Sequence, residues 1–255
     1  MNRLQQLFRD KKDICSVYFT AGYPNIDDTL PVLKALEDAG TDLVELGMPF
    51  SDPLADGPTI QASSEQALEN GMSIKRLFEQ IKDMRQTISM PVVLMGYFNP
   101  VFKYGVENFI AKCKEVGVDG LILPDLPFDE YREKYQELFE EAGIANILLI
   151  TPQTSDERIK LIDANSNGFI YVVSSASVTG AKKEVEQGQI NYFNRVNNLG
   201  LQSPRLIGFG ISNRSTFKTA CQHASGAIIG SAFVKLIGEH GAEGSKIEEF
   251  IKSIK

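Results

Sequence analysis

Histidine and cysteine are scarce in this chain of 255 residues, which has two histidines, three cysteines and no tryptophan. Cys15, Cys113 and Cys221 are widely spaced and form no C-x-x-C pair, so the pattern suggests neither a zinc clip nor a disulfide framework. We expect each to be a reduced, partly buried side chain. His223 and His240 fall on late helical segments, where we expect solvated surface residues rather than metal ligands.

Basic stretches and long apolar runs are also missing. The net charge of −7 and the scattering of lysine and arginine argue against a nucleic-acid surface. No apolar run approaches the length of a membrane span, and segment 1–10 is too polar for a secretory signal. Because Leu4, Leu7 and Phe8 share one helical face, this segment predicts a short amphipathic helix. We therefore expect a cytoplasmic protein.

Eight short apolar runs predict β-strands. They cover residues 14–19, 43–46, 92–95, 120–123, 146–150, 169–173, 206–209 and 227–229. Stretches with helical periodicity lie between them, among them 27–39, 74–87, 106–116 and 128–142. Strands that alternate with helices argue for a parallel sheet, because parallel strands need crossovers.

Eight such units in one chain favour an α/β fold of the closed kind, a single (β/α)₈ TIM barrel. We predict one domain over residues 1–255, with an extra N-terminal helix and long loops after strands two and six. A doubly wound sheet is the alternative. The lack of a G-x-G-x-x-G motif after the first strand weakens it.

One acidic residue lies within the predicted second strand. Glu45 shares a strand face with Leu43 and Gly47. If that face points into the barrel, burial raises the pKa of the carboxyl and suits it to general acid or base catalysis near neutral pH. An outward glutamate that caps a neighbouring helix is equally compatible with the spacing.

The segment 48–60 carries three prolines and a glycine, which predicts a shaped loop rather than a helix. It holds Asp52 and Asp56, and both could simply be turn formers. The length of the loop and its apolar residues Phe50 and Leu54 instead favour part of a site or an interface.

Glycine-containing loops after the last three strands predict a phosphate site, at 174–180, 208–212 and 230–231. Glycine lets backbone N–H groups approach an anion, and barrels commonly bind phosphate after strands seven and eight. No predicted strand ends in lysine, which disfavours a Schiff-base aldolase. Carboxylate acid–base catalysis remains, and it can break a carbon–carbon bond only if the substrate supplies its own electron sink.

The segment 45–61, which reads ELGMPFSDPLADGPTIQ, resembles the signature of tryptophan synthase alpha subunits. Six further matches follow the same order along nearly the whole chain: YFTAGYP at 18–24, MGYFNP at 95–100, LPDLP at 123–127, SVTG at 177–180, GFGIS at 208–212 and GS at 230–231. The resemblance implies retro-aldol cleavage of indole-3-glycerol phosphate to indole and glyceraldehyde 3-phosphate. Protonation of indole C3 makes an indolenine cation, which is the electron sink.

By similarity, Glu45 serves C3 and the glycerol hydroxyl as the acid–base residue, and Asp56 holds the indole N–H. Tyr171 orients the carboxylate or the substrate. The phosphate is expected against Gly180, Gly210, Gly230 and Ser231. The positions that match the indole pocket and its mouth are Tyr18, Met95, Tyr97, Leu123, Asp125 and Phe209.

Two departures from the family pattern are visible. Residues 174–177 lack the arginine and the glycine that many members carry before Val-Thr-Gly, in a lid loop whose Thr179 contacts the second-strand loop on closure. Tyr18 replaces the more usual phenylalanine and adds a hydroxyl that needs a partner.

The resemblance also implies a partner, a β subunit in an αββα complex that receives the indole. Asp52, Pro53, Asn99 and Pro100 match the partner-facing region. We expect no cofactor on this chain, because pyridoxal phosphate belongs to the β subunit. Two alternatives stay open: a self-sufficient lyase that needs no β subunit, and a non-catalytic subunit that only activates the β chain. A third is another phosphate-binding barrel isomerase.

Overall fold

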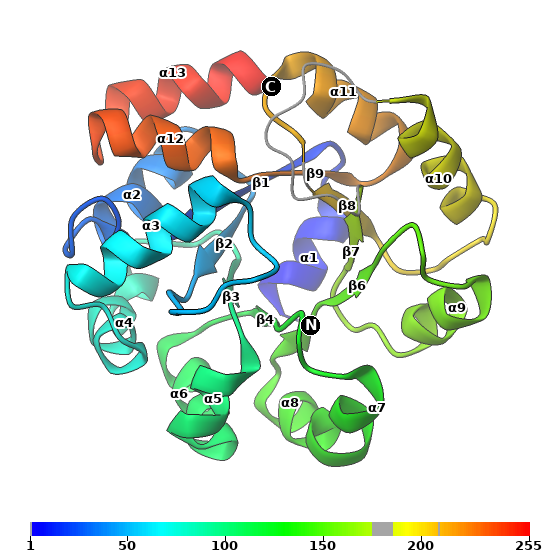
Figure 1. Cartoon of the computed structure of the whole chain (residues 1–255), viewed down its shortest axis with the longest axis horizontal. Coiled ribbons are helices and arrows are strands. Elements are labelled where there is room, and N and C mark those ends of the chain that lie inside the picture. The colour runs from blue at the N-terminus through cyan, green and yellow to red at the C-terminus, as the bar shows by residue number, and fades with distance from the viewer. Residues whose placement is uncertain (1, 175–185, 209) are drawn as a thin grey trace.

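The computed structural model describes residues 2–174, 186–208 and 210–255. Nine parallel strands form a ring in the order β5-β4-β3-β2-β1-β9-β8-β7-β6, and helices surround it (Figure 1). The strands are β1 (Ile14–Thr20), β2 (Leu43–Gly47), β3 (Val92–Met95), β4 (Gly120–Ile122), β5 (Ala145–Asn146), β6 (Leu148–Ile150), β7 (Ile170–Val173), β8 (Arg205–Gly208) and β9 (Gly226–Ile229).

The fifth predicted strand, 146–150, is interrupted in the structure. Its first part, β5, pairs with β4, and its second part, β6, pairs with β7. Ile147 lies between them, and its backbone N–H still donates to the carbonyl of Leu121 at 2.9 Å. The nine segments therefore occupy the eight strand positions of a nearly closed barrel, and the predicted (β/α)₈ fold is confirmed.

The helices follow the strands around the outside of the ring, except for α1. They are α1 (Arg3–Asp10), α2 (Thr29–Asp38), α3 (Pro58–Glu69), α4 (Ile74–Ile81), α5 (Phe98–Tyr104), α6 (Val106–Val116), α7 (Phe128–Glu130), α8 (Gln136–Ala142), α9 (Asp156–Ala164), α10 (Gln187–Asn197), α11 (Arg214–His223), α12 (Ser231–His240) and α13 (Gly244–Ile254). Within the described ranges, none of them has both the length and the apolar character needed to cross a membrane.

Three predicted boundaries need correction. The helix predicted over 74–87 ends at Ile81 and is followed by a separate 3₁₀ turn, η1 (Met84–Gln86). The helix predicted over 128–142 is divided by a π turn, η2 (Tyr131–Tyr135), on either side of which α7 and α8 continue. The loop predicted over 48–60 ends early, because Pro58 begins α3 at the position where proline is best tolerated in a helix.

Apolar side chains are buried on both sides of the strand ring. Inward side chains such as Leu43, Val93 and Ile122 fill the barrel, and α1 adds Leu4 and Leu7 at the end where the strands begin. A larger cluster lies between the strands and the outer helices. Burial on both faces explains why the strands carry no polar alternation.

The three cysteines are free, as the sequence predicted, and Cys15 and Cys113 are fully buried. His240 is exposed, also as predicted. His223 is half-buried instead, and its ring lies 5.7 Å from that of Phe193.

Candidate active site

Glu45 points into the barrel, so the inward of its two possible orientations is the one observed. Its side chain is 0 % exposed. The hydroxyl of Ser16 on β1 donates to Oε1 at 3.0 Å, whereas Oε2 has no hydrogen-bond partner among the described residues. Burial raises the pKa of Glu45 to about 8, and the Ser16 hydrogen bond opposes that rise. A carboxyl with such a pKa can give and take a proton near neutral pH.

Asp56 lies on the loop between β2 and α3. The hydroxyl of Tyr97 donates to its Oδ2 at 3.2 Å and accepts from the backbone N–H of Ala55 at 3.0 Å. Burial raises the pKa of Asp56 to about 6, and the bond from Tyr97 opposes it. The ring centroid of Phe50 lies 5.0 Å from that of Tyr97, which adds an apolar contact between the loop and the start of α5. These contacts hold Asp56 over the end of the barrel where the strands finish.

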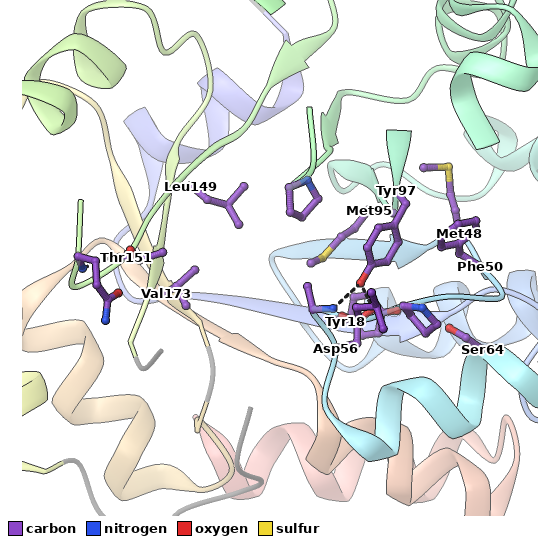
Figure 2. Close-up of a pocket in the computed structure, with 16 residues that line it drawn as sticks. Tyr18, Met48, Phe50, Asp56, Ser64, Met95, Tyr97, Leu149, Thr151 and Val173 are labelled. Carbon is purple, nitrogen blue, oxygen red and sulfur yellow. Dashed lines mark hydrogen bonds between the residues drawn. The ribbon is translucent and has the colours of Figure 1, made fainter. Parts of the chain in front are cut away.

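A cavity of about 620 Å³ opens at this end, and Figure 2 shows Asp56 and Tyr97 on one side of it with Leu149, Thr151 and Val173 opposite. It is lined by Tyr18, Met48, Phe50, Pro53, Leu54, Ala55, Asp56, Ser64, Met95, Gly96, Tyr97, Pro124, Leu149, Thr151, Gln153 and Val173. Most of these walls are apolar, which suits a flat ring that is held by few polar contacts.

Three of the residues predicted for the pocket line this cavity, namely Tyr18, Met95 and Tyr97. Leu123 does not, because Ile122 points into the barrel and the alternation along the strand turns Leu123 toward the outer helices. Asp125 does not line it either. It is exposed, and its carboxylate accepts the backbone N–H of Phe98 at 2.8 Å.

Sequence reasoning missed five lining residues that follow β4 or belong to β6, β7 and the loop after β6, which are Pro124, Leu149, Thr151, Gln153 and Val173. Strand periodicity carried a usable signal for two of them. Leu149 follows inward Ile147 by two positions, and Val173 follows inward Tyr171 by two. Phe209, also predicted for the pocket, lies outside the described residues.

Glu45 lies deeper than the lining residues. Its register partner on β1 is Tyr18, yet its carboxyl reaches back to Ser16, two residues earlier. Tyr18 lines the cavity at the level above. The carboxyl therefore sits beneath the cavity, in the layer that closes its lower end.

The side chains of Tyr18 and Tyr171 each pass over a glycine of the neighbouring strand, Gly47 and Gly208. A Cβ on Gly47 would lie 2.3 Å from the Tyr18 hydroxyl oxygen, and one on Gly208 would lie 2.2 Å from that of Tyr171. Only glycine leaves room for the two rings. Burial, followed by the charges of Glu45 and Asp56, raises the pKa of Tyr171, so its hydroxyl stays protonated close to both acids.

The hydroxyl that Tyr18 adds to the pocket has a partner. It lies 3.4 Å from Oγ1 of Thr20, which in turn lies 2.7 Å from Oγ of Ser63. The desolvation expected for this extra hydroxyl is therefore partly compensated.

A sequence model of the tryptophan synthase alpha chain family matches residues 4–254. The chain belongs to this family. The tryptophan synthase alpha chain of Flavobacterium psychrophilum is 57 % identical over 254 residues and is matched over the full length of both chains. The chain is accordingly a carbon–carbon lyase that cleaves indole-3-glycerol phosphate to indole and glyceraldehyde 3-phosphate.

Solved structures agree with the family assignment. A tryptophan synthase complex from Pyrococcus furiosus contains a chain that is 37 % identical, with a TM-score of 0.87 and coverage of 96 % of this chain and 98 % of that one. Tryptophan synthase from M. tuberculosis gives 28 % identity and a TM-score of 0.86, with coverage of 100 % and 98 %.

Two of the glycines expected to hold the substrate phosphate, Gly210 and Gly230, follow β8 and β9. Gly210 has a φ of +84°, and Gly230 precedes Ser231, the first residue of α12. None of these three lines the cavity described above. Gly180 and the lid residue Thr179 lie outside the described residues.

The residues expected to face a partner lie near the mouth of the cavity. Asp52 and Asn99 are exposed, and Pro53 and Pro100 are half-buried. Phe50, predicted to form an exposed tip with Leu54, is instead half-buried against Tyr97. Leu54 is 87 % exposed, and the structure adds a second apolar side chain, Phe102 on α5, at 62 %. Among the described residues, no group of three histidine, cysteine or acidic side chains could hold a metal ion.

Proposed function

We propose that Glu45 is the acid–base residue of the cleavage and that Asp56 binds the indole N–H. The observation that carries this assignment is a pair of carboxyls with raised pKa values, the buried Glu45 beneath the apolar cavity and the half-buried Asp56 on its wall. Two acids in different surroundings can take different roles in one reaction.

The proposed reaction needs no electron sink beyond the substrate. Protonated Glu45 gives its proton to indole C3, which places positive charge on the ring. Asp56 accepts the N–H and stabilises that charge. The bond between C3 and the glycerol chain then breaks as its electrons return to the ring, and the carboxylate of Glu45 takes the proton of the glycerol hydroxyl, which becomes the aldehyde. Tyr171, close to both acids, orients the carboxyl or the substrate.

We place the substrate phosphate at Gly180, Gly210, Gly230 and Ser231. The start of α12 at Ser231 supports this, because the N-terminal end of a helix carries a partial positive charge that favours an anion. The position of β8 and β9 around the barrel supports it as well, since β8 adjoins β7, which carries Tyr171, and β9 adjoins β1, which carries Tyr18. Leu123 and Asp125 stay predictions from the family resemblance, since neither lines the cavity described above.

We also propose that the chain works with a β subunit in an αββα complex and passes indole to it. The exposed apolar side chains Leu54 and Phe102 support a contact surface next to the cavity. Asp52, Pro53 and Asn99 belong to the same surface, and the Pyrococcus furiosus relative is a complex. On this proposal pyridoxal phosphate is carried by the β subunit alone. We further propose that residues 1–255 form one domain and that the chain is cytoplasmic.

Product formation from indole-3-glycerol phosphate by the purified chain, with and without a cognate β subunit, tests the proposal. We expect the β subunit to raise the rate of cleavage. An equal rate without it would favour the self-sufficient lyase. If Glu45→Gln leaves synthesis by the complex unchanged, the acid–base role belongs to another group and the assignment of Glu45 is wrong.

A further inference from the structure

Among the described residues, one side chain in the barrel interior donates a hydrogen bond to Glu45, and that donor is the serine Ser16. We propose that Ser16 is a positioning residue for the cleavage: its hydroxyl holds Oε1 of Glu45, so that Oε2 is the oxygen that exchanges a proton with the substrate. The proposal rests on the role of Glu45 proposed above.

The geometry separates the two carboxyl oxygens. Both side chains are 0 % exposed, and the Ser16 hydroxyl donates to Oε1 at 3.0 Å. Oε1 is thus the acceptor, and the proton of the neutral acid resides on Oε2, which has no partner among the described residues. The register neighbours of Ser16, Leu43 on β2 and Ile228 on β9, are apolar and offer no competing hydrogen bond.

The same bond lowers the pKa of Glu45 against the larger effect of burial. The charge of Glu45 acts on Tyr18 from β1 and Tyr171 from β7, Asp56 on the loop acts on the same two tyrosines, and β3 contributes the apolar Val93. Burial raises the pKa of Glu45, and the donation from Ser16 opposes it. A hydrogen bond to the ionised form favours that form, so its loss makes Glu45 a weaker acid.

Three variants separate positioning from folding. Ser16→Ala removes the donor, and Ser16→Thr retains a hydroxyl. Ser63→Ala is the matched control, because Ser63 is as deeply buried but bonds to Thr20 and to the Ile60 carbonyl instead of Glu45. If the alanine variant does not fold, Ser16→Cys takes its place, because a thiol is similar in volume to the hydroxyl but donates a weaker hydrogen bond.

Two measurements are made on each variant. The first is an infrared titration of the carboxyl band that disappears in Glu45→Gln. The second is the pH dependence of kcat and kcat/KM for indole-3-glycerol phosphate cleavage in the presence of the β subunit. In Ser16→Ala we expect the band midpoint and the alkaline limb of kcat/KM to move up together by about one pH unit. We expect the plateau of kcat to fall by roughly three- to tenfold, because a weaker acid protonates C3 more slowly.

KM should change less than about twofold on the same account, since Ser16 does not line the cavity. Ser16→Thr should restore the wild-type profile, and Ser63→Ala should keep it. An unmoved band midpoint in Ser16→Ala, with turnover still lost in Glu45→Gln, overturns the positioning role alone. Turnover that survives in Glu45→Gln overturns the catalytic role of Glu45, whatever Ser16 does.

Discussion

As the pH rises from 5 to 8, the free energy of unfolding of Glu45→Gln is expected to increase progressively relative to that of the wild type. The pKa of this carboxyl rises from 4.5 to about 8 on folding, mainly through burial. Above pH 4.5 the unfolded chain therefore releases a proton that the folded chain retains, and the free energy of unfolding falls until the pH passes about 8. Each pKa unit corresponds to about 1.4 kcal/mol, so the wild type should lose about 3.5 kcal/mol between pH 5 and 8 through this residue.

The assay is denaturant unfolding of wild type and Glu45→Gln at several pH values, with the difference in free energy plotted against pH. The difference cancels the contributions of other acids such as Asp56, and any cost of the buried amide is independent of pH. Glu79→Gln, an exposed glutamate on α4, should give a curve parallel to the wild type. A Glu45→Gln curve that also runs parallel would show that Glu45 is not buried as a raised-pKa acid, and the chemistry assigned to it would lose its physical basis.

Three further predictions concern the surroundings of the site. Tyr97→Phe removes the hydrogen bond that lowers the pKa of Asp56, so the pKa should rise and less of the carboxylate is ionised at pH 6. We therefore expect kcat/KM to fall several-fold at pH 6 and to recover by about pH 8. A loss that is independent of pH would contradict this. Gly208→Ala places a Cβ 2.2 Å from the Tyr171 hydroxyl oxygen and should cost about 1–3 kcal/mol in thermal unfolding, and an unchanged Tm would argue against that contact. Leu54→Asp should weaken binding of the β subunit at least about tenfold in calorimetry without changing chain stability, since Leu54 is exposed in the free chain, and unchanged affinity would remove it from the interface.

Much of the barrel could be predicted from sequence because its strands are short apolar runs covered on both faces. Helix α6 matched its prediction at both ends, since Gly117 adopts the left-handed conformation that terminates a helix. The interruption at Ile147 and the π turn η2 could not be predicted. Both depend on how helices and strands pack against one another, and the local periodicity of the sequence carries no information about that packing.

The site shows the same division. Periodicity placed Glu45 on a face with Leu43 but could not say which face is inside, because burial in the closed barrel decides that. The far wall of the cavity, including Leu149 and Thr151, comes from strands about a hundred residues further along the chain, as their numbering shows. The Ser16 hydrogen bond likewise joins two strands and has no local signal in either.

The most direct test of the central claim is the rate of indole formation from indole-3-glycerol phosphate by the complex with the β subunit, compared between wild type and Glu45→Gln. The proposed acid–base role predicts a fall in kcat of roughly 10²- to 10⁴-fold while substrate binding persists. Turnover in Glu45→Gln within about twofold of the wild type would contradict it and would move the proton transfer to another group.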